Sequence, residues 1–174
     1  MGKQYKELTA EDIEFIKKQK LFFIASVSSH EVNLAPRGYD SIRVEDSSTM
    51  YMLDLPGSSN RTARDSQENG KFTLLFTAFE GDARLVRVFC EATMIQKGEE
   101  DFSKVCKKFV MPEDIIRQFF KFDIVAVESS CGMSVPFMKY EEDRDALKDW
   151  AINQAQKDSL SDYIAKHEVP PKLW

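Results

Sequence analysis

The 174-residue chain carries 24 basic and 29 acidic side chains, and 43% of its residues are hydrophobic. This length fits a single domain, or one protomer of a compact oligomer, with enough apolar residues for a packed core. The basic residues are scattered rather than clustered. This argues against nucleic acid as a partner, because nucleic acid requires a concentrated positive surface.

The cysteines and histidines are few and are not spaced as metal ligands. Cys90, Cys106 and Cys131 show no C-x-x-C spacing, and His30 and His167 are the only histidines. We therefore predict no structural metal site. The sparse, odd cysteine count is typical of a reducing cytoplasm, the polar N-terminus is unlike a signal peptide, and no apolar run approaches the ~20 residues of a membrane span. We expect a cytoplasmic protein without a membrane partner.

The first predicted elements are a helix and two strands. Residues 9–20 predict a helix, because Thr9 is a favourable N-cap, acidic residues follow in the first turn and lysines occupy the last. The apolar run at residues 21–27 predicts a strand that is buried on both faces. Residues 32–34 predict the returning strand, after a turn at His30.

A break at Pro36-Arg37-Gly38 separates these strands from a predicted hairpin of residues 41–44 and 49–54. Gly38 permits an unusual backbone conformation there, or the close approach of a ligand. Ser59 or Asn60 is then the expected N-cap of a helix of about two turns.

Two more strands are predicted at residues 71–77 and 84–95. Because alternate residues of a strand face opposite sides, Arg84 and Arg87 are expected on opposite faces of the second strand. At most one of these two arginines is therefore expected to serve any one site.

The later part of the chain is predicted to be mainly helical. Phe102, Val105, Cys106 and Phe109 recur with helical spacing, which makes Cys106 a core residue. Pro112 is expected to open a second helix that carries Ile115, Ile116, Phe119 and Phe120, so that residues 99–121 are helical. A last strand at residues 122–127, a small-residue loop to residue 136 and helix within residues 141–167 complete the chain.

This order of elements predicts the fold. Six or seven strands in hairpin order, with helices added late, are typical of an antiparallel β-barrel with α additions. We predict one domain of residues 1–174. Its barrel core comprises about residues 21–95 and 122–136, and its helices lie at the N-terminus, in mid-chain and at the C-terminus.

The helix start near Asn60 is the strongest candidate for a binding site. Walker-type and G-x-G-x-x-G loops are absent from the sequence and neither histidine has a motif partner, so no catalytic residue is assigned. A helix N-terminus offers N–H groups to an anion. Arg61 and Thr62 would add a guanidinium and a hydroxyl, and Arg37 would close on a phosphate from the other side. The simpler interpretation is an ordinary capped surface helix with a solvated arginine.

Seven segments carry a family pattern through their order and spacing. They are Phe23-Ile24-Ala25-Ser26-Val27, Asn33-Leu34-Ala35-Pro36-Arg37-Gly38-Tyr39-Asp40, Tyr51-Met52-Leu53-Asp54, Asn60-Arg61-Thr62-Ala63, Glu68-Asn69-Gly70, Leu74-Leu75-Phe76 and Arg84-Leu85-Val86-Arg87-Val88. Together they resemble the FMN-binding split barrel of the pyridoxamine 5′-phosphate oxidase family. The Ser130-Cys131-Gly132…Val135-Pro136 loop also resembles one branch of that family.

The resemblance implies FMN at the interface of a homodimer. Arg37 and Arg61 would hold the phosphate, with the Thr62 hydroxyl in reach, and residues 52–54 would follow the isoalloxazine edge mainly through backbone groups. Ser130 and Cys131 would come from the second subunit. The implied cofactor site comprises Arg37, Gly38, Met52, Leu53, Asp54, Asn60, Arg61, Thr62, Leu85, Ser130 and Cys131.

The sequence departs from the oxidase itself at several positions. Ile42 and Thr62 stand where the oxidase has lysine, and Leu85 stands where it has a glutamine that touches the flavin ring. The C-terminal tail lacks the Arg-x-His pair that grips the pyridoxal substrate. We therefore expect a flavin scaffold that does not oxidise pyridoxamine phosphate.

Three functional hypotheses remain open at this point. The first is an FMN-dependent oxidoreductase of unknown substrate that acts as a homodimer. The second is a flavin carrier or sensor without turnover. The third is a barrel that holds haem or a deazaflavin; haem would need an axial ligand, for which His167 and His30 are the candidates.

Overall fold

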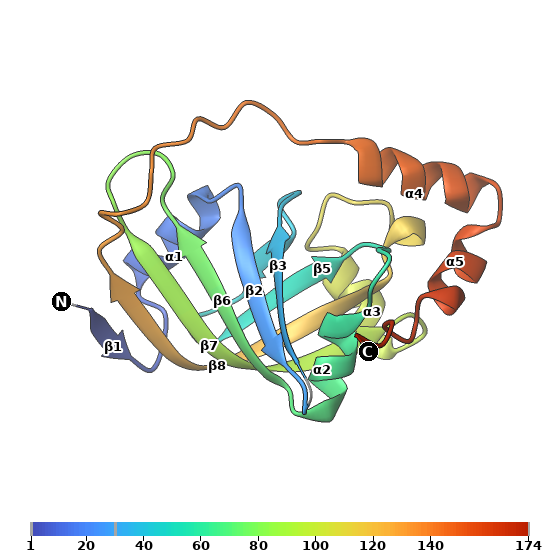
Figure 1. Ribbon diagram of the computed structural model, residues 1–174, viewed down its shortest axis with the longest axis horizontal. Coiled ribbons are helices and arrows are strands. Elements are labelled where there is room, and N and C mark those ends of the chain that lie inside the picture. Colours follow the sequence, from blue (N-terminus) through green and yellow to red (C-terminus); the bar gives the residue numbers. More distant parts are fainter. Residues whose placement is uncertain (1, 30, 174) are drawn as a thin grey trace.

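The computed structural model describes residues 2–29 and 31–173, and its centre is one curled antiparallel sheet (Figure 1). Seven of its eight strands lie in the order β3-β2-β6-β7-β8-β5-β4, and the eighth, β1, pairs with β8 outside this path. The strands are β1 (Lys3–Tyr5), β2 (Phe22–Val27), β3 (Val32–Arg37), β4 (Ile42–Val44), β5 (Thr49–Asp54), β6 (Lys71–Thr77), β7 (Leu85–Gln96) and β8 (Gln118–Ser130).

Five helices surround this half-barrel. They are α1 (Ala10–Lys18), α2 (Arg61–Glu68), α3 (Glu100–Cys106), α4 (Ala146–Gln156) and α5 (Leu160–Lys166), with a 3₁₀ turn at Glu113–Ile115. A long connection carries the chain from β8 across one end of the barrel to α4, and the C-terminal tail returns beside α2 (Figure 1). The predicted antiparallel split barrel with helical additions is therefore confirmed.

The core forms two clusters on the two sides of the sheet. The larger lies inside the curl, where Ile24, Leu74 and Val86 are fully buried. The smaller lies under α3, α4 and the 3₁₀ turn, where Ile115 and Phe119 are fully buried. Cys106 belongs to this second cluster, as its helical spacing predicted.

Strand β2 differs from its prediction, because only one of its faces is buried. Phe22, Ile24 and Ser26 are buried, whereas the residues between them are partly exposed. An alternating pattern of this kind belongs to a strand with one face on the core. The apolar residues on the other face, Phe23 among them, thus form an uncovered surface.

The predicted helix at residues 112–121 is wrong. One 3₁₀ turn follows Pro112, and β8 then begins at Gln118, so residues 118–121 are strand. At this end β8 lies between β5 and β7 with both faces covered: Phe119 packs on Phe102 and Phe120 on Phe72. A short apolar run buried on both faces is not distinguishable from a buried helix by periodicity.

The N-terminal strand β1 was not predicted, and it is held by a buried carboxylate on α1. Asp12 is fully buried and accepts a hydrogen bond of 2.8 Å from the Tyr5 hydroxyl, which belongs to β1. Its capping box with Thr9 starts α1, and the Arg84 guanidinium pairs with it at 2.6 Å. Asp12 therefore joins β1, α1 and the residue that precedes β7.

Replacing Asp12 with Asn should lower the free energy of unfolding by about 3 kcal/mol, because it leaves the Arg84 charge without its buried partner. Urea unfolding measures this change. Glu14→Gln is the matched control, since Glu14 lies on the same helix in an exposed pair with Lys17 and should change stability by less than about 0.5 kcal/mol. Equal effects of the two variants would contradict the assigned role of Asp12.

Candidate functional site

Helix α2 lies beside the β2–β3 hairpin and against β2 and β7 (Figure 1), and the Arg37 side chain from the end of β3 reaches Thr62 in its first turn. Asn60 is the N-cap residue, but its side chain makes no capping hydrogen bond, and the first turn contains no acidic side chain. The Asn60 amide instead donates to the Glu168 carbonyl at 3.1 Å and accepts from Gln118 at 3.0 Å. The start of α2 therefore keeps the character of an anion site, with N–H groups that no side chain caps.

Arg37 reaches this helix start, as the sequence predicted. Its Nη2 lies 3.3 Å from the Thr62 hydroxyl, to which it donates, and 3.3 Å from the Asp54 carboxylate. Its Nε is buried and has no hydrogen-bond partner among the described residues. Four of the predicted residues, Arg37, Asp54, Asn60 and Thr62, thus lie in one group.

Gln118 completes this group and was missed, because residue 118 was assigned to a helix. Its side-chain amide donates to Asp54 at 2.9 Å as well as to Asn60. Gln118 is buried and opens β8, next to β5, where Asp54 is its pairing partner. A correct strand register would have placed it beside Asp54; residue type alone carries no such signal.

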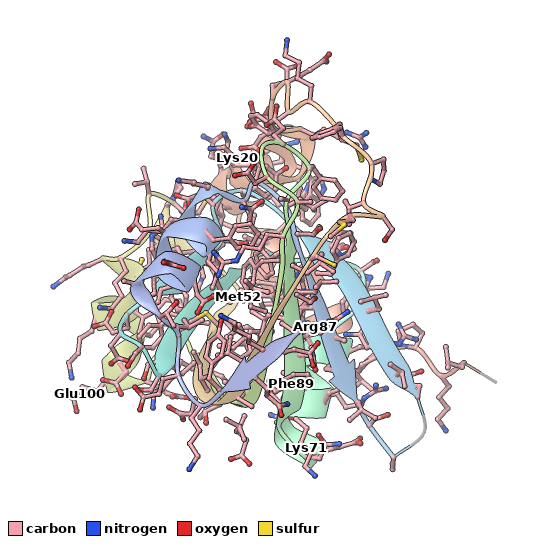
Figure 2. The ribbon with its side chains drawn as sticks, turned by 90° about the vertical axis from the view of Figure 1, so that its left-hand side faces the viewer. Lys20, Met52, Lys71, Arg87, Phe89 and Glu100 are labelled. Atoms are coloured by element: carbon pink, nitrogen blue, oxygen red, sulfur yellow. The ribbon has the colours of Figure 1, made fainter. Side chains whose placement is uncertain are left out.

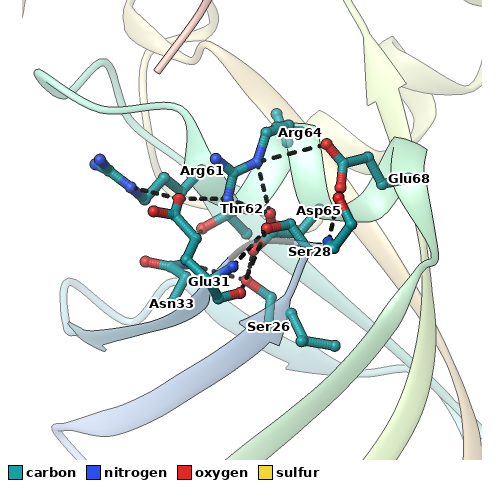
Figure 3. A network of polar contacts seen from close by, with 12 residues as sticks. Ser26, Ser28, Glu31, Asn33, Arg61, Thr62, Arg64, Asp65 and Glu68 are labelled. Carbon is teal, nitrogen blue, oxygen red and sulfur yellow. Dashed lines mark hydrogen bonds and ion pairs between the residues drawn. The ribbon is translucent and has the colours of Figure 1, made fainter. Parts of the chain in front are cut away.

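Arg61 points to a different partner. It pairs with Glu31 at 2.8 Å and donates to the Pro171 carbonyl at 2.9 Å. Glu31 also pairs with Arg64 at 2.6 Å, so one carboxylate bridges two arginines of α2 (Figure 3). Desolvation would raise the pKa of Glu31, but the hydrogen bonds and charges of Arg64 and Arg61 outweigh it and lower that pKa below its ordinary value.

A polar network below these arginines fixes α2 on the hairpin (Figure 3). Ser26 of β2 donates to Asp65 at 2.6 Å, and Asn33 of β3 donates to Ser26 at 3.1 Å and to Thr62 at 3.4 Å. Asp65 is fully buried and also pairs with Arg64 at 2.6 Å. The network holds the Thr62 hydroxyl at the end of β3, where Arg37 meets it.

Met52 and Leu53 lie in β5 with their side chains in the two core clusters. The Leu53 N–H donates to the Ser41 carbonyl at 2.8 Å, and both residues pair with β8. Their side chains are therefore unavailable to a ligand. A backbone contact with the flavin edge remains a prediction.

Gly38 does not have the unusual backbone that its position suggested. A side chain at residue 38 would meet only an ordinary contact, 3.6 Å from the Lys20 carbonyl. The left-handed residues are its successors, Tyr39 at φ 61° and Asp40 at φ 51°. Gly38 and Arg37 line a cleft of about 1460 Å³ that residues 138–144 also border.

Leu85, Ser130 and Cys131 form a second group on another part of the sheet. Leu85 pairs with Ser130 in the β7–β8 ladder, and Cys131 follows as an exposed residue. Gly132 then lies so close to Arg84 that a Cβ would come within 2.9 Å of its backbone nitrogen. Strands β2 and β6 separate this group from β3 and Arg37 within one chain. Its contribution from a second subunit remains a prediction.

The described histidine, His167, is not placed as an evident ligand. His30 lies outside the described residues. The His167 ring packs on Tyr163 at 4.2 Å, and its Nδ1 lies 2.9 Å from the Tyr163 carbonyl. Within residues 2–29 and 31–173, no cluster of three His, Cys, Asp or Glu side chains is suited to a metal ion. In the same part of the chain, no helix has the length and apolarity needed to cross a bilayer.

Comparisons with known proteins agree with the fold. No protein-family model matches the sequence. The pyridoxamine 5′-phosphate oxidase family protein ustO of Aspergillus flavus is 27% identical over 174 residues, which cover 95% of this chain and 70% of that protein.

Solved structures show the same fold. HupZ of Group A Streptococcus has a TM-score of 0.57 with 20% identity over 69% of this chain and 91% of its own. An FAD-binding protein from Mycobacterium smegmatis has a TM-score of 0.52 with 12% identity, covering 72% of this chain and 97% of its own. An FMN-binding protein from Syntrophomonas wolfei has a TM-score of 0.50 with 18% identity, covering 66% and 83%.

The chain is thus a split-barrel protein of the fold class that contains FMN- and FAD-binding proteins. The resemblance to the pyridoxamine 5′-phosphate oxidase family, predicted from the sequence, is confirmed.

Proposed function

We propose that this protein binds FMN and uses it as a homodimeric oxidoreductase, with the flavin phosphate at the start of α2 between Arg37 and Thr62. The observation that carries the proposal is the Arg37 Nε, a buried donor with no partner among the described residues. A buried donor of this kind is costly unless a ligand satisfies it, and a phosphate oxygen is a suitable acceptor.

The neighbouring groups fit a phosphate. The first turn of α2 offers backbone N–H groups and a partial positive charge, and the Thr62 hydroxyl is already oriented towards Arg37. Neither a cap nor an acidic side chain occupies that turn. These are the features by which a helix start recognises a phosphate monoester rather than a neutral sugar.

Two carboxylates already pair with the arginines of this site, so a phosphate has to compete with them. Asp54 lies 3.3 Å from Arg37, and Glu31 holds Arg61. Because Glu31 also pairs with Arg64, it would keep one cationic partner after Arg61 turned to the phosphate. We therefore infer that Arg61 exchanges Glu31 for the phosphate when FMN binds, at little electrostatic cost.

The flavin, when bound, supplies the hydride or electron chemistry, and the protein supplies binding and orientation. The side chains described above bind and position; none is assigned as an acid or base. The departures at Ile42, Thr62 and the C-terminal tail support a substrate other than pyridoxamine phosphate.

A homodimer is supported by the uncovered face of the sheet. On β3, Val32 is 77% exposed and Leu34 is 68% exposed, and Val125 on β8 is 58% exposed. Phe89 and Arg87 lie on the same side of β7 (Figure 2), where Arg87 is neutralised by Glu128 at 2.7 Å. A largely apolar sheet face on which the Arg87 charge is paired with Glu128 is suited to a second copy of itself.

Arg37→Gln should weaken FMN binding at least tenfold, because it removes a charge-assisted contact to the phosphate. Riboflavin, which lacks the phosphate, should bind wild type and variant alike. Isothermal titration with both ligands measures this. Arg43→Gln is the control, since Arg43 of β4 pairs with Asp40 and makes no contact with Thr62. If FMN affinity is unchanged in Arg37→Gln, the phosphate is not at Arg37.

Anaerobic mixing of the FMN-loaded protein with NADH or NADPH should bleach the blue absorption band of the oxidised flavin. Stopped-flow absorbance records the rate, and photoreduction of the same sample confirms that the flavin is redox-active. If photoreduction succeeds while neither nicotinamide reduces the flavin, the carrier or sensor alternative is favoured.

Leu34→Glu should convert the dimer to a monomer in sedimentation velocity, because it places a charge on the exposed apolar face. Val110→Glu is the matched control, since Val110 is 97% exposed on a distant turn and should leave the dimer intact. A monomeric wild type, or a dimer that persists in Leu34→Glu, would show that this face is not the interface.

A further inference from the structure

A second cleft lies on the side of α2 away from Arg37 and Thr62. It has a volume of about 1200 Å³ and is lined by Ala63, Arg64 and Gln67 of α2 and by Met94 near the end of β7. The C-terminal tail and α5 border its other side, and Arg117 and Gln118 also line it. Asn60 is the one predicted cofactor residue among its lining residues.

Arg117 is the unusual residue of this cleft. Its side chain is 94% buried, since the residue is only 6% exposed, yet it forms no ion pair with a carboxylate in the part of the chain that the structure describes. Its one side-chain hydrogen bond to the described residues runs from Nη2 to the His167 carbonyl at 2.9 Å. A guanidinium has five N–H donors, so most of the donors of Arg117 have no partner among the described residues.

Burial of such a charge is unfavourable unless a partner offsets it. Desolvation lowers the pKa of Arg117 from its ordinary value, although the charges of Asp54 and Glu168 act in the opposite direction. Buried charges in proteins are normally paired. Arg84 shows the usual arrangement in this molecule, with a buried carboxylate at 2.6 Å. An anion in the cleft would give Arg117 the partner that the described residues do not supply.

The other lining residues limit the kind of anion. Ile164 of α5 and Val169, Pro170 and Pro171 of the tail make much of the outer wall apolar. The charged lining residues balance in number, four basic against four acidic: Arg64, Lys97, Arg117 and Lys172 against Glu31, Asp114, Asp158 and Glu168. A balanced lining does not attract a polyanion, whereas one desolvated cation among apolar walls matches a single negative charge on an apolar body.

We propose that this cleft is a second binding site, for a small organic monocarboxylate with an apolar body, whose carboxylate pairs with the Arg117 guanidinium. The cleft is separate from the phosphate site proposed for FMN, because Arg37 and Thr62 do not line it, although Asn60 and Gln118 border both. This ligand would be a substrate or an effector, and it lacks the phosphate that the flavin site is proposed to recognise.

Octanoate is the probe, and its neutral analogue octanamide is the matched control ligand. The full-length protein is titrated with each while the Arg117 side-chain Nε–H resonance is followed by ¹⁵N NMR, assigned by its absence from Arg117→Gln. Octanoate should shift this resonance saturably, and octanamide should bind at least tenfold more weakly, because it lacks the charge.

In calorimetry, Arg117→Gln should lower the affinity for octanoate at least tenfold. Two control variants should bind octanoate within a few-fold of wild type: Arg117→Lys, which keeps the charge, and Arg43→Gln, which leaves the cleft unchanged. If Arg117→Gln does not fold, as judged by circular dichroism, the wild-type titration decides. The proposal is overturned if octanoate produces no saturable shift, or if octanamide binds equally well. It is also overturned if FMN displaces octanoate, since the cleft would then be part of the flavin site; that result would leave flavin binding itself intact.

Discussion

The attachment of α2 to the β2–β3 hairpin is the constraint on which the candidate site depends. Asp65 is fully buried and accepts from Ser26 while it pairs with Arg64. A buried carboxylate tolerates little displacement from such partners, because an unpaired charge there costs several kcal/mol. The helix start is therefore fixed relative to the end of β3, and this is what brings Thr62 within reach of Arg37.

The same arrangement keeps the charged side chains at the start of α2 paired within the protein. Arg37 contacts both Thr62 and Asp54, and Arg61 pairs with Glu31 and donates to a carbonyl of the C-terminal tail. The buried Arg37 Nε, in contrast, has no hydrogen-bond partner among the described residues. Binding of a phosphate is thus an exchange of partners rather than the capture of free charges, and much of its Coulombic gain offsets contacts that are lost.

The tail and α5 connect the two proposed sites. Carbonyls of His167, Glu168 and Pro171 accept from Arg117, Asn60 and Arg61 respectively. One short segment therefore contacts a residue of the second cleft and two residues of the α2 start. A change in its position is the physical route by which occupancy of one site would alter the other.

The sequence predicted strands correctly where the residue pattern is compatible with only one type of secondary structure. The strands at residues 49–54 and 71–77 match those of the structure in both bounds, because alternating or apolar runs between turn residues specify strands of that length. It failed at residues 118–121, where apolar residues are buried on both faces and the helical and extended interpretations coincide.

That one error also concealed part of the site. Gln118 and Arg117 were assigned to a helix, so their positions beside Asp54 and in the second cleft were not foreseen. The pairing of Arg61 with Glu31 was missed for another reason. The two residues are 30 positions apart, and no local pattern encodes which carboxylate a long arginine side chain will reach.

Binding of a phosphate dianion at Arg37 and the start of α2 is tested by ³¹P NMR of bound FMN. The second pKa of a phosphate monoester in water is about 6. Arg37 and the helix start favour the doubly charged form, so bound FMN should keep the chemical shift of the dianion as the pH falls from above to below this value. A bound phosphate that titrates like free FMN would be solvated, and that result would contradict the assigned site.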